Sequence, residues 1–222
     1  MKNTKRLLAV ICAVLLVGIS AVGTVAYLTD KTEEVNNTFS VGKLLEDPSK
    51  FVLLEHEAKD EDKDGVYQLD ISSEVKENSY TVLPGVDLPK DPFVRTDEEL
   101  KLDAYVFIEV KDATGSALHF SVDDSKWTEL TGKTGPQGGK VYVMEANNGI
   151  VEAGTKLGPI TILTDNKITV DNAEITDAAK QFGGDVKFYG YMIQAGGFSS
   201  AADAWAKGFA PAETESESGE TE

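Results

Sequence analysis

Cysteine, histidine and positive charge are all scarce in this chain of 222 residues. It contains one cysteine, Cys12, and two histidines, His56 and His119. Lys and Arg together number 21 against 38 Asp and Glu, which gives a formal net charge of -17. Such a chain has no basic patch with which to displace counterions from phosphate, so the charge argues against nucleic acid as a partner. Disulfides cannot stabilise the fold, which must depend on a hydrophobic core.

The same scarcity restricts catalysis. A zinc peptidase needs two histidines at helical spacing with a nearby carboxylate, or another set of three ligands. His56 and His119 lie 63 residues apart, and we expect His56 to be a surface histidine on a strand. A cysteine nucleophile is excluded if the segment that holds Cys12 is removed, and no convincing Gly-x-Ser-x-Gly elbow occurs. We therefore expect no enzymatic activity.

Charge is absent from a long stretch near the N-terminus. Three basic residues among the first six precede an uncharged run at positions 7–29, which ends in small residues. This pattern is typical of a signal peptide, and Thr24 and Ala26 fit the small-residue positions before a cleavage site. We expect cleavage before Tyr27, with cleavage after Gly23 as the second choice. An uncleaved anchor is the alternative, because 23 residues are enough to span a bilayer.

Export would leave a mature chain without cysteine and with a formal charge of about -20, because 18 Lys and Arg would face 38 Asp and Glu. Membrane contact would then occur only through an uncleaved signal. The strongly acidic mature surface would keep the protein soluble outside the cell by self-repulsion.

Alternating apolar residues predict a β protein. Residues 103–111 place four aliphatic side chains on one face, the period of a strand with a buried side. Similar runs, separated mostly by turn residues, occur at positions 39–45, 51–57, 66–71, 119–122, 140–144, 159–163 and 186–193. These runs predict an all-β fold, a jelly-roll-like β-sandwich.

Two segments have helical composition, at positions 172–182 and 199–207, and we expect short helices on the surface of the sandwich. No linker divides residues 39–210, so a single domain is expected there. Residues 27–38 form an N-terminal extension, and the acidic tail at 211–222 should be disordered.

Aromatic residues at strand spacing, such as Tyr105, Phe107 and Tyr191, fit either a core or a platform that stacks on carbohydrate, and packing is the commoner use. Trp127 lies among turn residues and is the candidate for an exposed aromatic.

The segment from Asp60 to Gly65 resembles the start of a calcium loop. Asp60, Asp62 and Asp64 supply carboxylates at alternate positions and Gly65 follows them. The twelfth position, which should be a bidentate acid, is Ile71. The alternative is a solvated acidic hairpin turn with no ion. Calcium is the only cofactor that the sequence suggests.

Two motifs near the N-terminus carry a family resemblance. Residues 26–30 read Ala-Tyr-Leu-Thr-Asp, and residues 37–44 read Asn-Thr-Phe-Ser-Val-Gly-Lys-Leu. The chain thereby resembles the TasA/camelysin group of Gram-positive exported proteins, whose long signals are cut by a SipW-type signal peptidase. Weaker similarity continues at 84–92, 103–110, 165–170 and 197–205. The motif positions are Asp30, Asn37, Thr38, Phe39, Gly42 and Leu44.

The resemblance implies a secreted structural protein, a subunit of an extracellular matrix (biofilm) or of a surface fibre. In that family, subunits assemble by strand addition, and the donor here would be residues 27–38, with the protein itself as partner. Alternatives are a monomeric cell-surface or adhesion module that binds glycan, calcium or a host protein, and a camelysin-like metallopeptidase. The charges of Lys31, Glu33 and Glu34 depart from an apolar donor strand.

Overall fold

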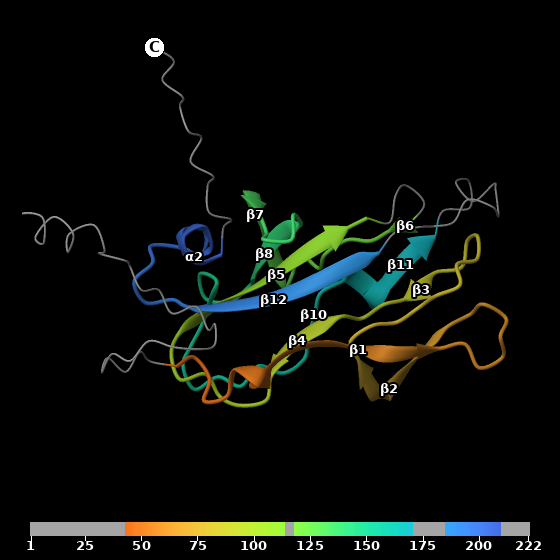
Figure 1. Ribbon diagram of the computed structural model, residues 1–222, viewed down its shortest axis with the longest axis horizontal. Coiled ribbons are helices and arrows are strands. Elements are labelled where there is room, and N and C mark those ends of the chain that lie inside the picture. Colours follow the sequence, from red (N-terminus) through yellow and green to blue (C-terminus); the bar gives the residue numbers. More distant parts are fainter. Residues whose placement is uncertain (1–42, 114–117, 171–184, 210–222) are drawn as a thin grey trace, which may run out of the picture.

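The computed structural model describes residues 43–113, 118–170 and 185–209, and within these ranges the protein consists mainly of β-strands with one short α-helix (Figure 1). The all-β fold predicted from alternation is therefore confirmed. The predicted jelly-roll connection and the single domain at 39–210 stay predictions. The predicted helix at 172–182, the signal, the N-terminal extension and the tail at 211–222 lie outside the described residues.

The first sheet has the strand order β10-β4-β1-β2. All of its pairs are antiparallel, and β1 pairs with β4 through its first half and with β2 through its second half. A β-bulge between His56 and Glu57 interrupts the pairing of the second half with β2. The strands are β1 (Phe51–Lys59), β2 (Gln68–Val75), β4 (Phe93–Thr96) and β10 (Ile160–Thr161), and the 3-10 turn η1 (Pro48–Lys50) leads into β1.

The second sheet has the order β12-β5-β8-β7, and the short strand β9 also pairs with β5. Its long central strand β5 is paired along its whole length with β12. The strands are β5 (Ala104–Asp112), β7 (Trp127–Thr134), β8 (Lys140–Met144), β9 (Ile150–Val151) and β12 (Val186–Gln194).

A third, small sheet joins β3 (Leu88–Pro89), β11 (Lys167–Val170) and β6 (Leu118–His119), and the 3-10 turn η2 (Thr164–Asn166) precedes β11. The two larger sheets contribute to one apolar cluster that includes Val94, Val106, Ile108 and Ile162. Burial of such aliphatic side chains is the main favourable term that holds the layers together.

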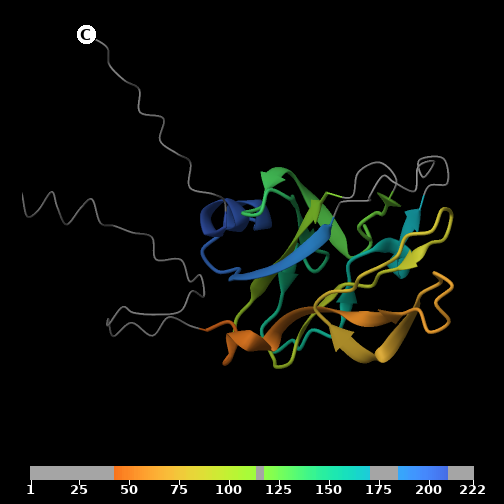
Figure 2. The same cartoon turned by 45° about the vertical axis from the view of Figure 1, so that its right-hand side comes forward.

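The helix α2 (Ala201–Gly208) covers the other face of the second sheet. Ser200 caps its N-terminus by accepting a hydrogen bond from the backbone N–H of Asp203. Trp205 is fully buried against Phe107 and Tyr191. In both ribbon views, α2 and the β1–β2 hairpin lie on opposite sides of the β5–β12 pair (Figures 1 and 2).

Several sequence predictions need correction. Leu44 and Leu45 form bends rather than the end of a strand, and residues 39–42 lie outside the described ranges. The strand expected at 66–71 begins at Gln68 and extends to Val75. The runs at 119–122 and 159–163 contain only the short strands β6 and β10, although Val122 forms a bridge with Leu163.

Trp127 is buried, not exposed. Only 2% of its surface is accessible, and its indole N–H donates a hydrogen bond to the carbonyl oxygen of Thr161. It begins β7, which the sequence did not predict, and packs in the core between the sheets. The turn residues around Trp127 led to the prediction of a loop, although a strand with a buried first residue begins there.

Candidate functional site

The strand β12 forms one edge of its sheet, and a groove of about 640 Å³ lies along its first half. Within the described part of the chain, β5 is the only strand that pairs with β12. An unpaired strand edge presents N–H and C=O groups through which another strand can be added. Leu53, Val82 and Phe188 supply apolar lining, and each is only partly buried.

A buried ion pair lies in this groove. Glu55, in the middle of β1, and Lys90, just after β3, bring Oε2 and Nζ to 2.5 Å. Only 4% of Glu55 and 8% of Lys90 is exposed. The Oε1 atom of Glu55 has no hydrogen-bond donor among the described residues. A buried carboxylate oxygen without a donor is unfavourable, so this atom is a ready acceptor for a group that enters the groove.

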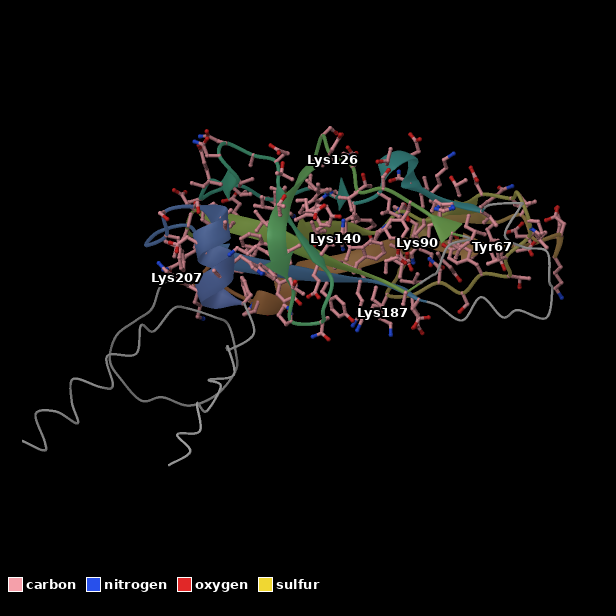
Figure 3. The ribbon with its side chains drawn as sticks, turned by 90° about the horizontal axis from the view of Figure 1, so that it is seen from above. Tyr67, Lys90, Lys126, Lys140, Lys187 and Lys207 are labelled. Carbon is pink, nitrogen blue, oxygen red and sulfur yellow. The ribbon has the colours of Figure 1, made fainter. Side chains whose placement is uncertain are left out.

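Lys90 lies among the side chains in the middle of the molecule, whereas Lys187 lies at its margin (Figure 3). The Lys90 ammonium is 5.9 Å from the centroid of the Tyr80 ring, which also lines the groove. The Tyr80 hydroxyl donates a hydrogen bond to the carbonyl of Pro89 at 2.6 Å. Burial, with a contribution from the charges of Glu55 and Asp91, raises the pKa of Tyr80.

His56, which follows Glu55, and Asp91, which follows Lys90, form a second acid–base pair. Asp91 places Oδ2 at 2.6 Å from Nδ1 of His56 and accepts the His56 backbone N–H through Oδ1. His56 also packs on the ring of Phe93. The prediction of a surface histidine on a strand is therefore right about the strand, but the side chain is more enclosed than expected. His119 lies at the end of β6 and is exposed, so the structure does not bring the two histidines into one described site.

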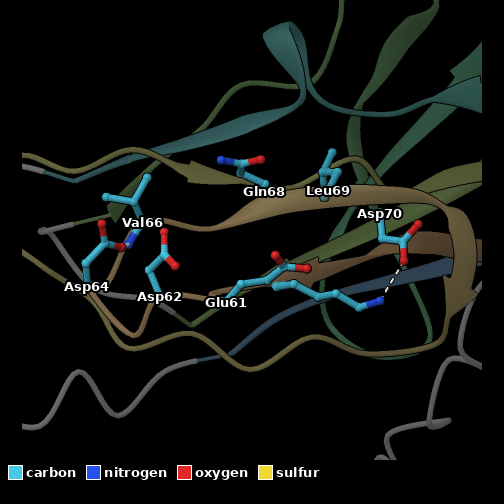
Figure 4. A pocket seen from close by; sticks show the side chains of 8 residues that line it. Glu61, Asp62, Asp64, Val66, Gln68, Leu69 and Asp70 are labelled. Carbon is cyan, nitrogen blue, oxygen red and sulfur yellow. Dashed lines mark hydrogen bonds and ion pairs between the residues drawn. The ribbon is translucent and has the colours of Figure 1, made fainter.

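The acidic loop between β1 and β2 is built as a hairpin turn. Both carboxylate oxygens of Asp60 accept backbone N–H groups, from Asp64 and from Gly65. Gly65 has φ of +84°, in the left-handed region that glycine tolerates. A hollow of about 310 Å³ beside this turn is lined by Asp62 and Asp64 (Figure 4).

Asp70, the nearest acid to the twelfth position of a calcium loop, is bound elsewhere. Its Oδ2 accepts a hydrogen bond from Lys59 at 2.6 Å, and its Oδ1 accepts one from the Ser72 hydroxyl. These hydrogen bonds lower the pKa of Asp70. Among the described residues, no group of three or more His, Cys, Asp or Glu is placed to hold a metal ion. Asp60 thus serves to cap the turn, as the alternative interpretation of this segment has it.

The predicted signal and motif residues fall almost wholly outside the described ranges. They are Thr24, Ala26, Tyr27, Asp30, Asn37, Thr38, Phe39 and Gly42. Leu44 is the exception, and it packs against the main core.

The sequence did not identify Glu55 and Lys90 as partners. Lys90 and Asp91 lie between two prolines, which is an unusual sequence. It does not show which strand lies opposite them. Long-range pairing of this kind depends on the sheet topology.

In the described parts of the chain, no helix is long and apolar enough to cross a membrane. Comparison with known proteins gives no match to a family model, to a curated protein or to a solved structure.

Proposed function

We propose that this protein is a secreted, non-catalytic structural subunit of an extracellular matrix or surface fibre of a Gram-positive bacterium, and that it assembles by β-strand addition. The observation that carries the proposal is the edge of β12, which no strand of the described residues pairs, beside an open groove with half-buried apolar side chains. Sheet edges of this kind bind extended segments by main-chain hydrogen bonds, while alternate side chains enter pockets.

The donor in this proposal is residues 27–38 of a second copy. Export and cleavage before Tyr27 by a SipW-type peptidase would place this segment at the start of the mature chain. The segment is polar, so it cannot form a core of its own. In the groove its backbone would be paired by β12, and its inward side chains would cover Leu53 and Phe188.

The test compares the mature protein, begun at Tyr27, with a form begun at Asn37. Circular dichroism should show a folded β protein in both, because β1 begins only at Phe51. Electron microscopy and sedimentation should show fibres for the longer form alone. Equal assembly by both forms would contradict strand addition by residues 27–38. Monomers in both cases would favour the alternative, a binding module on the cell surface.

Processing has its own test. Mass-spectrometric sequencing of the protein from culture supernatant should give Tyr27 as the first residue. Intact protein that retains residues 1–26 in the membrane fraction would contradict the secreted assignment.

A further inference from the structure

The charges of the donor segment are arranged by face. In an extended strand, residues two apart share a face, so an extended donor segment would have Thr29, Lys31, Glu33 and Val35 on one face. This face carries one positive and one negative charge. The opposite face, Leu28, Asp30, Thr32 and Glu34, carries two negative charges and no positive one.

The groove carries a matching pattern. On β1, Leu53 lies two residues before Glu55 and shares its face, and Leu88 lies two residues before Lys90. All four side chains line the groove. The acceptor groove thus presents Glu55 and Lys90 beside leucines. The donor face presents Lys31 and Glu33 between Thr29 and Val35.

We infer that Lys31 and Glu33 of a second copy enter the groove and pair with Glu55 and Lys90, so that the four charges select the inward face and the register of the added strand. This inference rests on the proposed function, because it takes residues 27–38 as the occupant. Lys31 supplies the hydrogen-bond donor that the Oε1 atom of Glu55 lacks among the described residues, and Glu33 supplies a second acceptor for the Lys90 ammonium.

The electrostatics penalise the alternative arrangement. A shift of one residue turns every side chain to the other face. It would bring Asp30 and Glu34 to a groove that already contains the buried carboxylate of Glu55. Like charges placed together in an interface reduce affinity strongly, whereas a complementary set fixes orientation. The charged donor residues are therefore a source of specificity rather than a defect.

The experiment measures binding of labelled synthetic peptides to the mature full-length chain by fluorescence anisotropy at low protein concentration. The first peptide has the sequence of residues 27–38. The second carries Lys31→Glu with Glu33→Lys, which reverses the charges and keeps the composition. The third carries Asp30→Asn with Glu34→Gln on the other face and is the matched control. None of these changes alters the folded acceptor, so misfolding cannot imitate the result.

We expect the natural and control peptides to bind alike and the reversed peptide to bind about tenfold or more weakly, a difference of about 1.4 kcal/mol. Raising the salt concentration should weaken the natural peptide. Equal binding of natural and reversed peptides would overturn the inference and leave strand addition standing. Failure of the natural peptide to bind would also overturn it, and the comparison of chains begun at Tyr27 and Asn37 would then decide the proposed function separately.

Discussion

The two faces of β12 differ in how completely the chain covers them. On the face toward α2, Ile193 is fully buried and the partly buried Tyr191 packs on Trp205 and Phe209, with ring centroids 5.2 Å apart in both cases. On the face toward β1, Phe188 and Met192 are only partly buried, and Phe188 lines the groove. We call the side toward α2, which holds the buried Ile193 and the Trp205 ring cluster, the completed face, and the side toward β1, where no side chain of β12 is fully buried, the groove face.

The two faces differ because the described chain supplies a packed aromatic cluster on the α2 side only. Behind α2, Trp205 contacts Phe107, Tyr191 and Phe209 at centroid distances of 5.0 to 5.2 Å, in tilted or edge-to-face arrangements. Such pairs add stability beyond the apolar area that they bury. On the groove side, apolar side chains remain available for contact with a further segment.

The completed face should be the more sensitive to mutation. Trp205→Ala would remove the largest side chain of the aromatic cluster and leave a cavity that β5 and β12 cannot close. We expect a loss of about 3–5 kcal/mol in the free energy of unfolding. Chemical denaturation followed by circular dichroism measures it. A loss below that of a groove-side variant would contradict the ranking of the two faces.

A buried carboxylate also stabilises the completed face. Glu109 is fully buried, its Oε1 accepts backbone N–H groups of Gln137 and Gly139, and its Oε2 accepts the Tyr191 hydroxyl. Glu109→Ala would leave these donors unpaired, at a cost of about 1–3 kcal/mol. Glu109→Gln keeps a carbonyl acceptor and is the matched control. Equal stability of both variants would show that these hydrogen bonds contribute little.

Alkaline pH offers a comparison of one tyrosine on each face. Burial raises the pKa of both Tyr191 and Tyr80 above the ordinary value near 10. The folded state then keeps the phenolic proton to higher pH than the unfolded state, so stability is constant below pH 10 and falls as pH rises above it. Tyr191→Phe and Tyr80→Phe should each flatten this fall in thermal denaturation curves. An unchanged alkaline profile in both variants would contradict the assignment.

The groove face should tolerate truncation better. Phe188→Ala removes a side chain that is only partly buried, so we expect a loss of about 1 kcal/mol in stability. Assembly should suffer far more than folding, because the ring is one of the apolar contacts offered to an added strand. Sedimentation of the folded variant measures this. Normal fibres from Phe188→Ala would remove the groove from the assembly mechanism.

The acidic turn lies outside both faces and serves as a reference. Asp60 already uses both carboxylate oxygens on backbone N–H groups. Calcium, added or removed with a chelator, should therefore leave the thermal midpoint unchanged. A calcium-dependent rise that Asp62→Asn abolishes would restore the calcium loop as a site.

Alternation and helical composition predicted the elements whose residues carry a clear pattern. The strands β5, β8 and β12 and the helix α2 appear close to where the sequence placed them, because aliphatic periodicity and helical composition report local geometry. The strand β7 was missed because, after Trp127, most of its side chains are polar and exposed. Its partner β8 supplies the pairing that its own sequence does not indicate.

Charged residues in buried positions could not be predicted in this way. Alternation places Glu109 on the face opposite the aliphatic residues of β5, and the sequence does not show that the turn before β8 and the Tyr191 hydroxyl meet it there. Glu55 and Lys90 are 35 residues apart and meet across different sheets. Hydrophobic alternation predicts the apolar residues that line the groove. The position of Glu55 and Lys90 depends on the sheet topology.

Gly190 explains where the groove ends. A Cβ at this position would lie 3.2 Å from the Phe51 ring, so the absence of a side chain lets Phe51 approach the middle of β12. The groove follows β12 from Val186 to Tyr189 and stops at this contact. The Phe51 ring thus borders the groove on the Gly190 side. A polymer built by insertion of donor strands into this groove would be polar, with every subunit facing the same way and two chemically different tips.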